Sequence, residues 1–425
     1  MLLRFEVSNH RSIYEPVELS MVAVDEDRPA ARSFDLINEQ VLTVAGIYGP
    51  NASGKSNLID ALGWLSSAVG RSLRTWDKAI PRDPFRFKRG PEEPSTFELE
   101  MMVDGVRYTY TLTLDHTNVI FEGLYSYPER RRRILFEREG LEIAFRRGLG
   151  GISGTRDLLT PNTLALSAAM RFDALEVSPF GRRLASFGYL GQPRRRRRLG
   201  FTGVPTYSTE RMFIDLSDPD ALFDLQDMEQ FGGYGSALSL LRFADLGIDN
   251  VEIVEEQLSD PAGDPRLRRY VRLIHRVAGE QLAFNMAEES EGTQTWYRLI
   301  GPTLQALQNG QLLLFDEIDA SLHPRLSARL LELFQDPVTN PRGAQLIFTS
   351  HDTSLLNHLN RDEVWLTEKN EEGATVLTAL AEYGGDKVRR SMNLERAYLQ
   401  GRFGAVPEVD QILLRQALGI ATGDS

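Results

Sequence analysis

The stretch Gly49-Pro50-Asn51-Ala52-Ser53-Gly54-Lys55-Ser56 fits the phosphate-binding pattern G-x-x-x-x-G-K-[ST] at every fixed position. An apolar run over 41–48 comes directly before it and predicts a buried strand, and a helical pattern starts at Asn57. Strand, glycine-rich loop and helix are the context that this motif needs. The alternative is a chance glycine-rich turn before a helix, and two further motifs in the chain argue against it.

The loop residues have distinct physical roles in such a site. Glycines allow backbone N–H groups to turn inward, and the N-terminus of the following helix adds a positive dipole, so that an anion is held without a large side chain. Lys55 is expected to contact the β- and γ-phosphates as a point charge. The hydroxyl of Ser56 is expected to bind Mg²⁺. The predicted ligands are therefore ATP and Mg²⁺.

Composition narrows the class of protein. A chain of 425 residues is too long for one simple core, and 42% hydrophobic with 25% charged residues is ordinary for a soluble globular protein. The absence of cysteine excludes disulfides, thiolate metal sites and a thiol nucleophile, and it fits a cytoplasmic location. No signal peptide or membrane span is expected. A net charge of -12 argues against a broadly basic nucleic-acid coat.

Three regions are predicted, with boundaries at 1–125, 126–285 and 286–425. The first is strand-rich apart from a helix over 57–75, and residues 96–103 and 106–112 form a hairpin across Asp104-Gly105. The second is predicted to be a mainly helical insertion without a coiled coil, with one strand at 252–259. The helices of the second region are predicted at 162–172, 179–189, 219–229 and 235–246. For the third region we expect helices at 293–308, 324–334, 393–400 and 408–418, buried strands at 311–317 and 345–350, and an edge hairpin at 363–377.

Two acids end a buried strand in the third region. Asp316 follows the apolar run 312–315 and, at the carboxyl end of a parallel strand, can hold the metal through water. Glu317 projects elsewhere, and its natural role is to polarise the attacking water as general base. Standing alone, the pattern could equally be a strand followed by a turn. Together with the phosphate-binding loop, it favours a nucleotide site.

Two more segments are candidates for contact with a triphosphate. His351 follows the strand 345–350 and could hydrogen-bond the γ-phosphate. The stretch Ser290-Glu291-Gly292-Thr293-Gln294 opens a helix, whose backbone N–H groups and dipole could form a second anion site. A plain helix cap by Ser290 explains the same residues equally well.

Taken together, these motifs resemble an ABC-type ATPase head of the kind found in SMC and Rad-type proteins. The matching pieces, in the order of that family, are GPNASGKS at 49–56, SEGTQ at 290–294, LLLFDE at 312–317, IDASLHP at 318–324 and TSHD at 349–352. The resemblance implies an α/β P-loop head with a mixed sheet and flanking helices. It also implies that two heads enclose two ATP molecules, so that Ser290 and Gly292 act in trans and Asp319 lies at the dimer seam.

A closer resemblance is to compact bacterial ATPases of the RloA and OLD type, seen in anti-phage defence operons. The opening Phe5–Ile13 resembles their FxNFRSI start, and residues 393–407 resemble their AYLxGRFGAxP ending. The chain departs from the family in three ways. It has SEGTQ where the family has LSGGQ, and it has no Q-loop glutamine between 57 and 100, where the segment 83–87 stands at the position of that loop. No nuclease domain is expected after the last ATPase strands. The implied nucleotide-binding set is Arg11, Gly49, Asn51, Ala52, Ser53, Gly54, Lys55, Ser56, Asn57, Ser290 and Gly292.

Several functions remain open at this point. The first is an ATP-hydrolysing dimeric switch that controls a partner effector, such as a nuclease encoded nearby. The others are an SMC-like DNA-maintenance ATPase and a non-catalytic ATP-bound scaffold or inhibitor of a toxic partner. Two arginine runs, Arg130–Arg133 and Arg194–Arg198, could contact nucleic acid, although solvated loop charge is favoured because no aromatic residues are interleaved.

Overall fold

The computed structural model describes residues 1–25, 30–34, 37–146, 149, 154–172, 176–191, 208–215, 233–244, 247–259, 265–320, 322–383 and 393–404. The helical patterns at 219–229 and 408–418 and the arginine run Arg194–Arg198 lie outside these residues. In the part of the chain that is described, no helix combines the length and the apolar character needed to cross a membrane.

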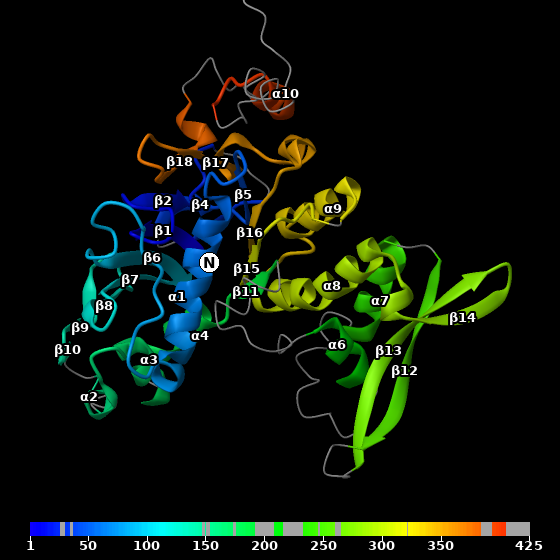
Figure 1. The fold of residues 1–425 in the computed structure, drawn as a ribbon, viewed down its shortest axis with the longest axis horizontal. Helices are drawn as coiled ribbons and strands as arrows, with labels where there is room; N and C mark the ends of the chain where they lie inside the picture. Colours follow the sequence, from blue (N-terminus) through cyan, green and yellow to red (C-terminus); the bar gives the residue numbers. More distant parts are fainter. Residues whose placement is uncertain are drawn as a thin grey trace, which may run out of the picture.

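An antiparallel sheet of seven strands forms the first layer (Figure 1). Alternating buried and exposed side chains run along β1, where Phe5 and Val7 point to the core and Glu6 to solvent. Asp104 and Gly105 both have positive φ and form the predicted hairpin turn between β6 and β7. In sheet order the strands are β10 (Glu142–Phe145), β9 (Arg133–Glu139), β8 (Val119–Tyr127), β7 (Val106–Leu114), β6 (Ser95–Val103), β1 (Leu2–Ser8) and β2 (Val17–Ser20).

A second sheet of six strands carries the phosphate-binding loop. Its strands are parallel except for the antiparallel edge strand β18, and its central strands are buried on both faces. In sheet order they are β11 (Gly188–Leu190), β15 (Leu312–Phe315), β16 (Gln345–Thr349), β5 (Val44–Tyr48), β17 (Val364–Lys369) and β18 (Thr375–Ala379). A separate pair, β3 (Arg32–Phe34) and β4 (Ile37–Val41), completes this region, so the predicted strand 41–48 divides at residues 42–43.

Helix α1 (Lys55–Thr75) lies between the two sheets, and this position defines one of two hydrophobic cores. Ala45 and Ile47 of β5 face α1 and the seven-stranded sheet, with α3 (Ala165–Ala169) and α4 (Ser178–Ala185) at the far end of α1. The intervening residues Val44 and Tyr48 face a second core on the other side. There the sheet is covered by α8 (Glu291–Asn309), α9 (Pro324–Gln335), the short helices η6 (Thr353–His358) and η7 (Arg361–Glu363), and α10 (Leu394–Leu399).

A buried ion pair attaches α3 to the first sheet. Glu122 and Arg138 are both fully buried, 3.6 Å apart. Glu122 accepts hydrogen bonds from the backbone N–H groups of Ala165 (2.6 Å) and Leu166 (2.8 Å), so it caps the start of α3. Arg138 donates to three backbone carbonyls, including that of Thr160 at 2.7 Å. Because every charged atom has a partner, the pair fixes the layer around the far end of α1.

The middle region corrects the prediction of a mainly helical insertion. Besides α6 (Thr209–Asp215) and α7 (Gly233–Ala244), it holds a three-stranded antiparallel sheet of β12 (Ile248–Ser259), β13 (Pro265–Val277) and β14 (Glu280–Asn285). Val271 and Leu273 are buried, and Arg272 between them is partly exposed, so the strand alternates with period two. In Figure 1 this sheet extends away from the six-stranded sheet.

Most of the other predicted elements are confirmed. Helices α1, α8 and α9 and strands β12, β15, β16, β17 and β18 lie where the sequence predicts them. The pattern at 162–172 becomes the short helices α2 (Thr155–Leu158, just before it), α3 and η2 (Met170–Phe172). The pattern at 179–189 was wrong at its end, because residues 188–190 pair with β15 as strand β11.

Candidate functional site

The phosphate-binding loop leaves β5 and enters α1 with three residues at positive φ. These are Gly49 (149°), Ala52 (64°) and Gly54 (112°). A Cβ added at Gly49 would lie 2.3 Å from the carbonyl oxygen of Thr367, and one at Gly54 would lie 2.0 Å from the Thr375 hydroxyl. Backbone conformation and close packing therefore both require glycine at these two positions.

The first turn of α1 is open at its N-terminal end. Gly54 is the N-cap residue, and no side chain caps the helix. The backbone N–H groups of a helix start have no partner within the helix, and they carry the positive end of the dipole. Asn51 and Ala52 are exposed at the loop surface, whereas Ser53 and Lys55 are buried. This arrangement fits a bound anion such as a phosphate group.

Lys55 occupies the centre of the loop. Its ammonium group donates hydrogen bonds to the carbonyl oxygens of Gly49 (2.7 Å) and Pro50 (3.0 Å). Burial lowers the pKa of Lys55 to about 8, and the nearby carboxylates of Asp316, Asp319 and Glu317 act in the opposite direction. The structure thus brings the predicted lysine and the predicted acids into one electrostatic site.

A hairpin braces the loop from outside. The hydroxyl of Thr375, on β18, donates to the carbonyl of Ser53 at 2.8 Å and lies 2.7 Å from the Ser12 hydroxyl. Asn57 donates to that same Ser12 hydroxyl at 2.5 Å, and Thr367 on β17 lies 2.6 Å from the Ser53 hydroxyl. Sequence reasoning predicted the hairpin and missed its contact with the loop, because side-chain pairs more than 300 residues apart leave no local signal.

The two acids are fixed by one threonine. Thr349 ends β16, and its hydroxyl donates to Asp316 Oδ1 at 2.9 Å and accepts from the backbone N–H of Glu317 at 2.7 Å. Asp316 is buried, and its own N–H donates to Leu190 of β11 at 2.9 Å. Glu317 has a φ of 62°, a left-handed conformation that is costly for a residue with a side chain. The TSHD segment contains Thr349, but sequence reasoning gave a role only to His351.

The next two residues of that segment hold Asp319. The Ser350 hydroxyl donates to Asp319 Oδ1 at 2.8 Å, and the backbone N–H of His351 donates to the same oxygen at 3.1 Å. His351 is exposed at the strand end. Because β15, β16 and β5 are parallel neighbours, their carboxyl ends bring Asp316, Thr349 and the loop to one edge of the sheet.

Arg11 is engaged in carboxylate pairs behind the loop. Its guanidinium group lies 2.8 Å from Asp60 of α1 and 3.4 Å from Asp83, and its φ of 52° is also left-handed. Asp83 belongs to the segment 83–87 expected in place of a Q-loop, so this segment lies beside the turn that contains Arg11 and Ser12. Arg11 was predicted to bind nucleotide, and the structure shows in addition that it forms ion pairs with Asp60 and Asp83.

Ser290 and Gly292 lie at the start of α8. The Ser290 hydroxyl accepts from the backbone N–H of Thr293 at 3.1 Å, so the helix-cap interpretation is confirmed as a local fact. Ser290 is exposed and Gly292 half-buried, next to the β13–β14 hairpin, where His275 and Glu289 lie 2.8 Å apart. Among the described residues, no hydrogen bond or ion pair joins this helix start to the phosphate-binding loop of the same chain.

The described arginine run is mostly paired within the chain. Arg132 lies 3.9 Å over the ring of Tyr125, Arg133 lies 3.5 Å from Glu129, and Arg130 donates to Asn38 at 3.0 Å. Such pairs are weak at an exposed site, so they leave the surface positively charged. The geometry agrees with ordinary solvated loop charge.

The comparisons with known proteins identify a family. The family model described as "AAA domain, putative AbiEii toxin, Type IV TA system" matches residues 44–161 and 205–357, which is more than half of the chain. A solved SMC head bound to the C-winged helix domain of ScpA is 14% identical, with 90% of this chain and 99% of that chain covered and a TM-score of 0.47. The SMC head domain from Thermotoga maritima is 13% identical, with 89% and 98% covered and a TM-score of 0.39. No curated protein matches the chain.

Proposed function

Because this chain belongs to that family of AAA ATPase domains, we propose that it is a Mg²⁺-dependent ATPase that works as a dimeric switch. One observation carries the proposal. Lys55 of the phosphate-binding loop shares a single electrostatic site with Asp316, Glu317 and Asp319 at the carboxyl ends of parallel strands. A lysine for the phosphates, with carboxylates nearby for Mg²⁺ and for the attacking water, is the combination that P-loop ATPases use in phosphoryl transfer.

The loop would hold the triphosphate of ATP. Backbone N–H groups of the loop from Asn51 to Gly54 and of the uncapped start of α1 would donate hydrogen bonds to phosphate oxygens, and Lys55 would add its charge. Ser56 and Asp316 would hold Mg²⁺, which when bound neutralises the charge that develops on the phosphates. Ser56 stands in the first turn of α1, and Asp316 offers a buried carboxylate, which is the ligand type that Mg²⁺ prefers.

Glu317 would act as the general base on the attacking water. Thr349 holds the Glu317 backbone in its left-handed conformation, and this turn directs the two neighbouring acids differently. Asp316 would then bind the metal, while Glu317 would accept a proton from the attacking water. His351, exposed beside Asp319, would contact the γ-phosphate.

A second copy of the chain would complete the site. Ser290 and Gly292 are accessible at the start of a long helix, and its N–H groups and dipole suit an anion. In the proposed closed dimer, the helix start of one chain meets the ATP on the loop of the other, and Asp319 lies at the seam. Hydrolysis would release the contact, so that the nucleotide sets whether the dimer is closed.

The switch would act on a partner in anti-phage defence of the RloA and OLD type. The three-stranded sheet β12–β14 is attached next to the start of α8, so a change in the contacts of Ser290 would reach it directly. Such a projecting sheet offers surface to an effector, for instance a nuclease encoded nearby. A role in the cytoplasm, and contact with nucleic acid through Arg130–Arg133 or Arg194–Arg198, belong to the same proposal.

The decisive experiment uses Glu317→Gln. The amide cannot accept the proton of the attacking water, so ATP and Mg²⁺ should trap a stable dimer, measured by light scattering coupled to size-exclusion chromatography. Glu332→Gln is the matched control, because Glu332 lies at the surface and its side chain, among the described residues, pairs with Arg329 of the same helix. That variant should turn over ATP and show no trapped dimer.

Two results would contradict the proposal in different ways. A Glu317→Gln protein that binds ATP and stays monomeric would remove the dimeric switch. A wild-type protein that binds ATP tightly without turnover would instead indicate an ATP-bound scaffold or inhibitor. Both are read from the same samples by adding a phosphate-release assay.

A further inference from the structure

A second basic site lies at the opposite end of α1 from the phosphate-binding loop. It is a hollow of about 340 Å³ between the last turns of α1, the short helices α3 and η2, and α4. Gly70 of α1 allows α4 to approach closely here, because an added Cβ would lie 3.3 Å from the Cβ of Ala185. The volume is within the range of pockets that hold small molecules.

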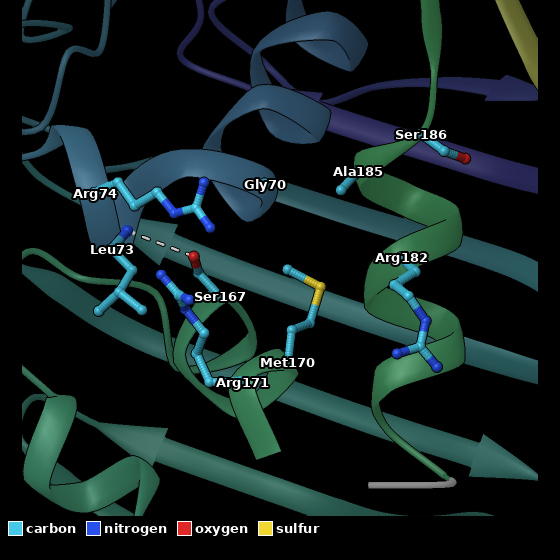
Figure 2. A pocket seen from close by; sticks show the side chains of 9 residues that line it. All are labelled: Gly70, Leu73, Arg74, Ser167, Met170, Arg171, Arg182, Ala185 and Ser186. Carbon is cyan, nitrogen blue, oxygen red and sulfur yellow. Dashed lines mark hydrogen bonds between the residues drawn. The ribbon is translucent and has the colours of Figure 1, made fainter. Parts of the chain in front are cut away.

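Three arginines and one serine define its chemistry. Arg74, Arg171 and Arg182 come from three different helical elements, and none of the nine described residues that line the hollow is acidic. Ser167 is only 5% exposed; its hydroxyl accepts from the backbone N–H of Leu73 at 3.4 Å, which leaves its own proton free to donate. Figure 2 shows the guanidinium groups of Arg74 and Arg171 on either side of this hydroxyl, and Arg182 across the hollow.

These positive charges stand in a protein that is acidic as a whole. The protein has a formal net charge of -12, yet three cations surround one hollow whose described lining has no carboxylate. Arg74 and Arg171 are exposed, and an anion placed between their two guanidinium groups is attracted to both. The planar fork of arginine matches phosphate oxygens in a bidentate manner, and a buried hydroxyl adds a directed donor.

A purely structural role, namely stabilisation of a helix C-terminus, can explain each of the three arginines when it is considered alone. Arg74 and Arg182 lie in the last turns of their helices, and Arg171 in η2, where positive charge stabilises the helix dipole. That explanation does not require the three side chains to surround a common hollow beside a serine hydroxyl. It predicts an effect on stability alone, without ligand binding, so the two interpretations can be separated.

We propose that this hollow is a binding site for a compact phosphate-bearing anion, held by Arg74, Arg171 and the Ser167 hydroxyl. The compact shape favours a small molecule over a nucleic-acid backbone, because a polymer needs a row of cations along a surface. The ligand would contact α1, whose first turn carries Lys55 and Ser56, and would link α1 to α3, η2 and α4. The site does not depend on the ATPase proposal.

The test uses the full-length chain with Lys55→Ala, which weakens phosphate binding at the loop. Inorganic pyrophosphate and AMP are titrated separately by calorimetry, to distinguish a free polyphosphate from a nucleotide. We expect at least one of these two probes to bind with a stoichiometry of one molecule per chain. Adding Arg74→Gln and Arg171→Gln should weaken it by about tenfold or more, since a charge-assisted hydrogen bond is lost with each.

The matched control removes two positive charges elsewhere. Arg89→Gln and Arg329→Gln, in the same background, change exposed arginines that pair with a glutamate three residues away, so affinity should stay within about twofold. Equal losses in both double variants, or no binding of either probe to the Lys55→Ala protein, would overturn the proposal. Binding of a twelve-nucleotide single strand that depends on Arg74 and Arg171, with no binding of the small anions, would replace it by a nucleic-acid contact. Circular dichroism confirms that each variant is folded.

Discussion

The phosphate-binding loop and the start of α8 are both proposed to bind phosphate groups, but the structure fixes their residues in different ways. At the loop, Lys55 is 5% exposed and Asp316 is 1% exposed, and hydrogen bonds from β16, β17 and β18 fix the surrounding residues. At α8, Ser290 is exposed and is fixed by its own helix through Thr293. The loop is held in place by residues of its own chain, whereas Ser290 stands at an exposed helix start. This difference is what a site shared between two copies would require.

Lys55→Ala should have the largest effect on this comparison. Removing the only side-chain charge of the loop should weaken ATP binding by at least about 100-fold, because charged hydrogen bonds to the phosphates are lost. Lys78→Ala is the control, since Lys78 is an exposed lysine outside the loop. Equilibrium binding of a fluorescent ATP analogue measures both. Unchanged binding would show that the loop does not hold the nucleotide.

Mixing two inactive variants tests whether the sites belong to different copies. Lys55→Ala disables the loop, and Ser290→Arg disables the helix start, where an exposed position can accommodate the larger side chain. An equimolar mixture should recover about a quarter of wild-type ATPase activity, because half of the dimers are mixed and each has one intact composite site. Failure to recover activity, when each variant alone still forms dimers with wild-type chain, would place both sites in the same copy.

Thr349→Val should lower turnover with little change in binding. Valine keeps the shape of threonine and removes the hydroxyl that bonds to Asp316 and to the Glu317 backbone, so kcat should fall by about 10- to 100-fold. ATP affinity should stay within about twofold, since Thr349 does not line the loop. Thr349→Ser restores the hydroxyl and should recover most of the activity. A serine variant as slow as the valine variant would remove the positioning role.

The pH dependence of binding sharpens the electrostatic side of the comparison. With a pKa of about 8 for Lys55 in the free protein, ATP binding above pH 8 has to be accompanied by proton uptake. Affinity should therefore fall by up to about tenfold per pH unit above pH 8.

The lowered pKa of Lys55 also affects folding stability, in the opposite direction. Between pH 8 and the ordinary lysine pKa of 10.5, the unfolded chain holds more protons, so the unfolding free energy rises with pH. Binding that is flat from pH 7 to 9.5, measured by calorimetry, would contradict this pKa.

Ser290→Ala should have the smallest effect of these variants. It tests whether Ser290 only caps α8 or also contacts the nucleotide on a second copy of the chain. Loss of the cap should cost about 1 kcal/mol in urea unfolding. Asn393→Ala is a matched variant, because Asn393 caps α10 through a 2.7 Å hydrogen bond from the Arg396 N–H. Both should lose similar stability. If only the Ser290 variant also loses ATPase activity, the helix start serves the nucleotide; if neither does, it is only a cap.

Much of the fold could be predicted because the decisive signals are local. Alternation in 96–112 around Asp104-Gly105 predicted β6 and β7, and the apolar runs before Gly49, Asp316 and His351 predicted three buried strands. The prediction failed where local patterns conflict with tertiary pairing. Residues 188–190 follow a helical segment and become a strand only because β15 pairs with them. The strand at 252–259 was predicted, but its arginine-rich partner β13 was not, because β13 is stabilised as a strand by its pairing with β12 and β14.

The sequence by itself determined which chemical groups are present and which strand each one follows, because motif spacing and hydrophobic period are properties of neighbouring residues. It therefore specified the loop at 49–56, the acids at 316–317 and the helix start at 290–292. Only the tertiary structure decided which groups meet. Thr349 joins both acids, Thr375 and Ser12 brace the loop, Arg11 pairs with Asp60 and Asp83, and three arginines surround one hollow. These contacts depend on strand order and on the packing of α1 between two sheets, which no short stretch of sequence encodes.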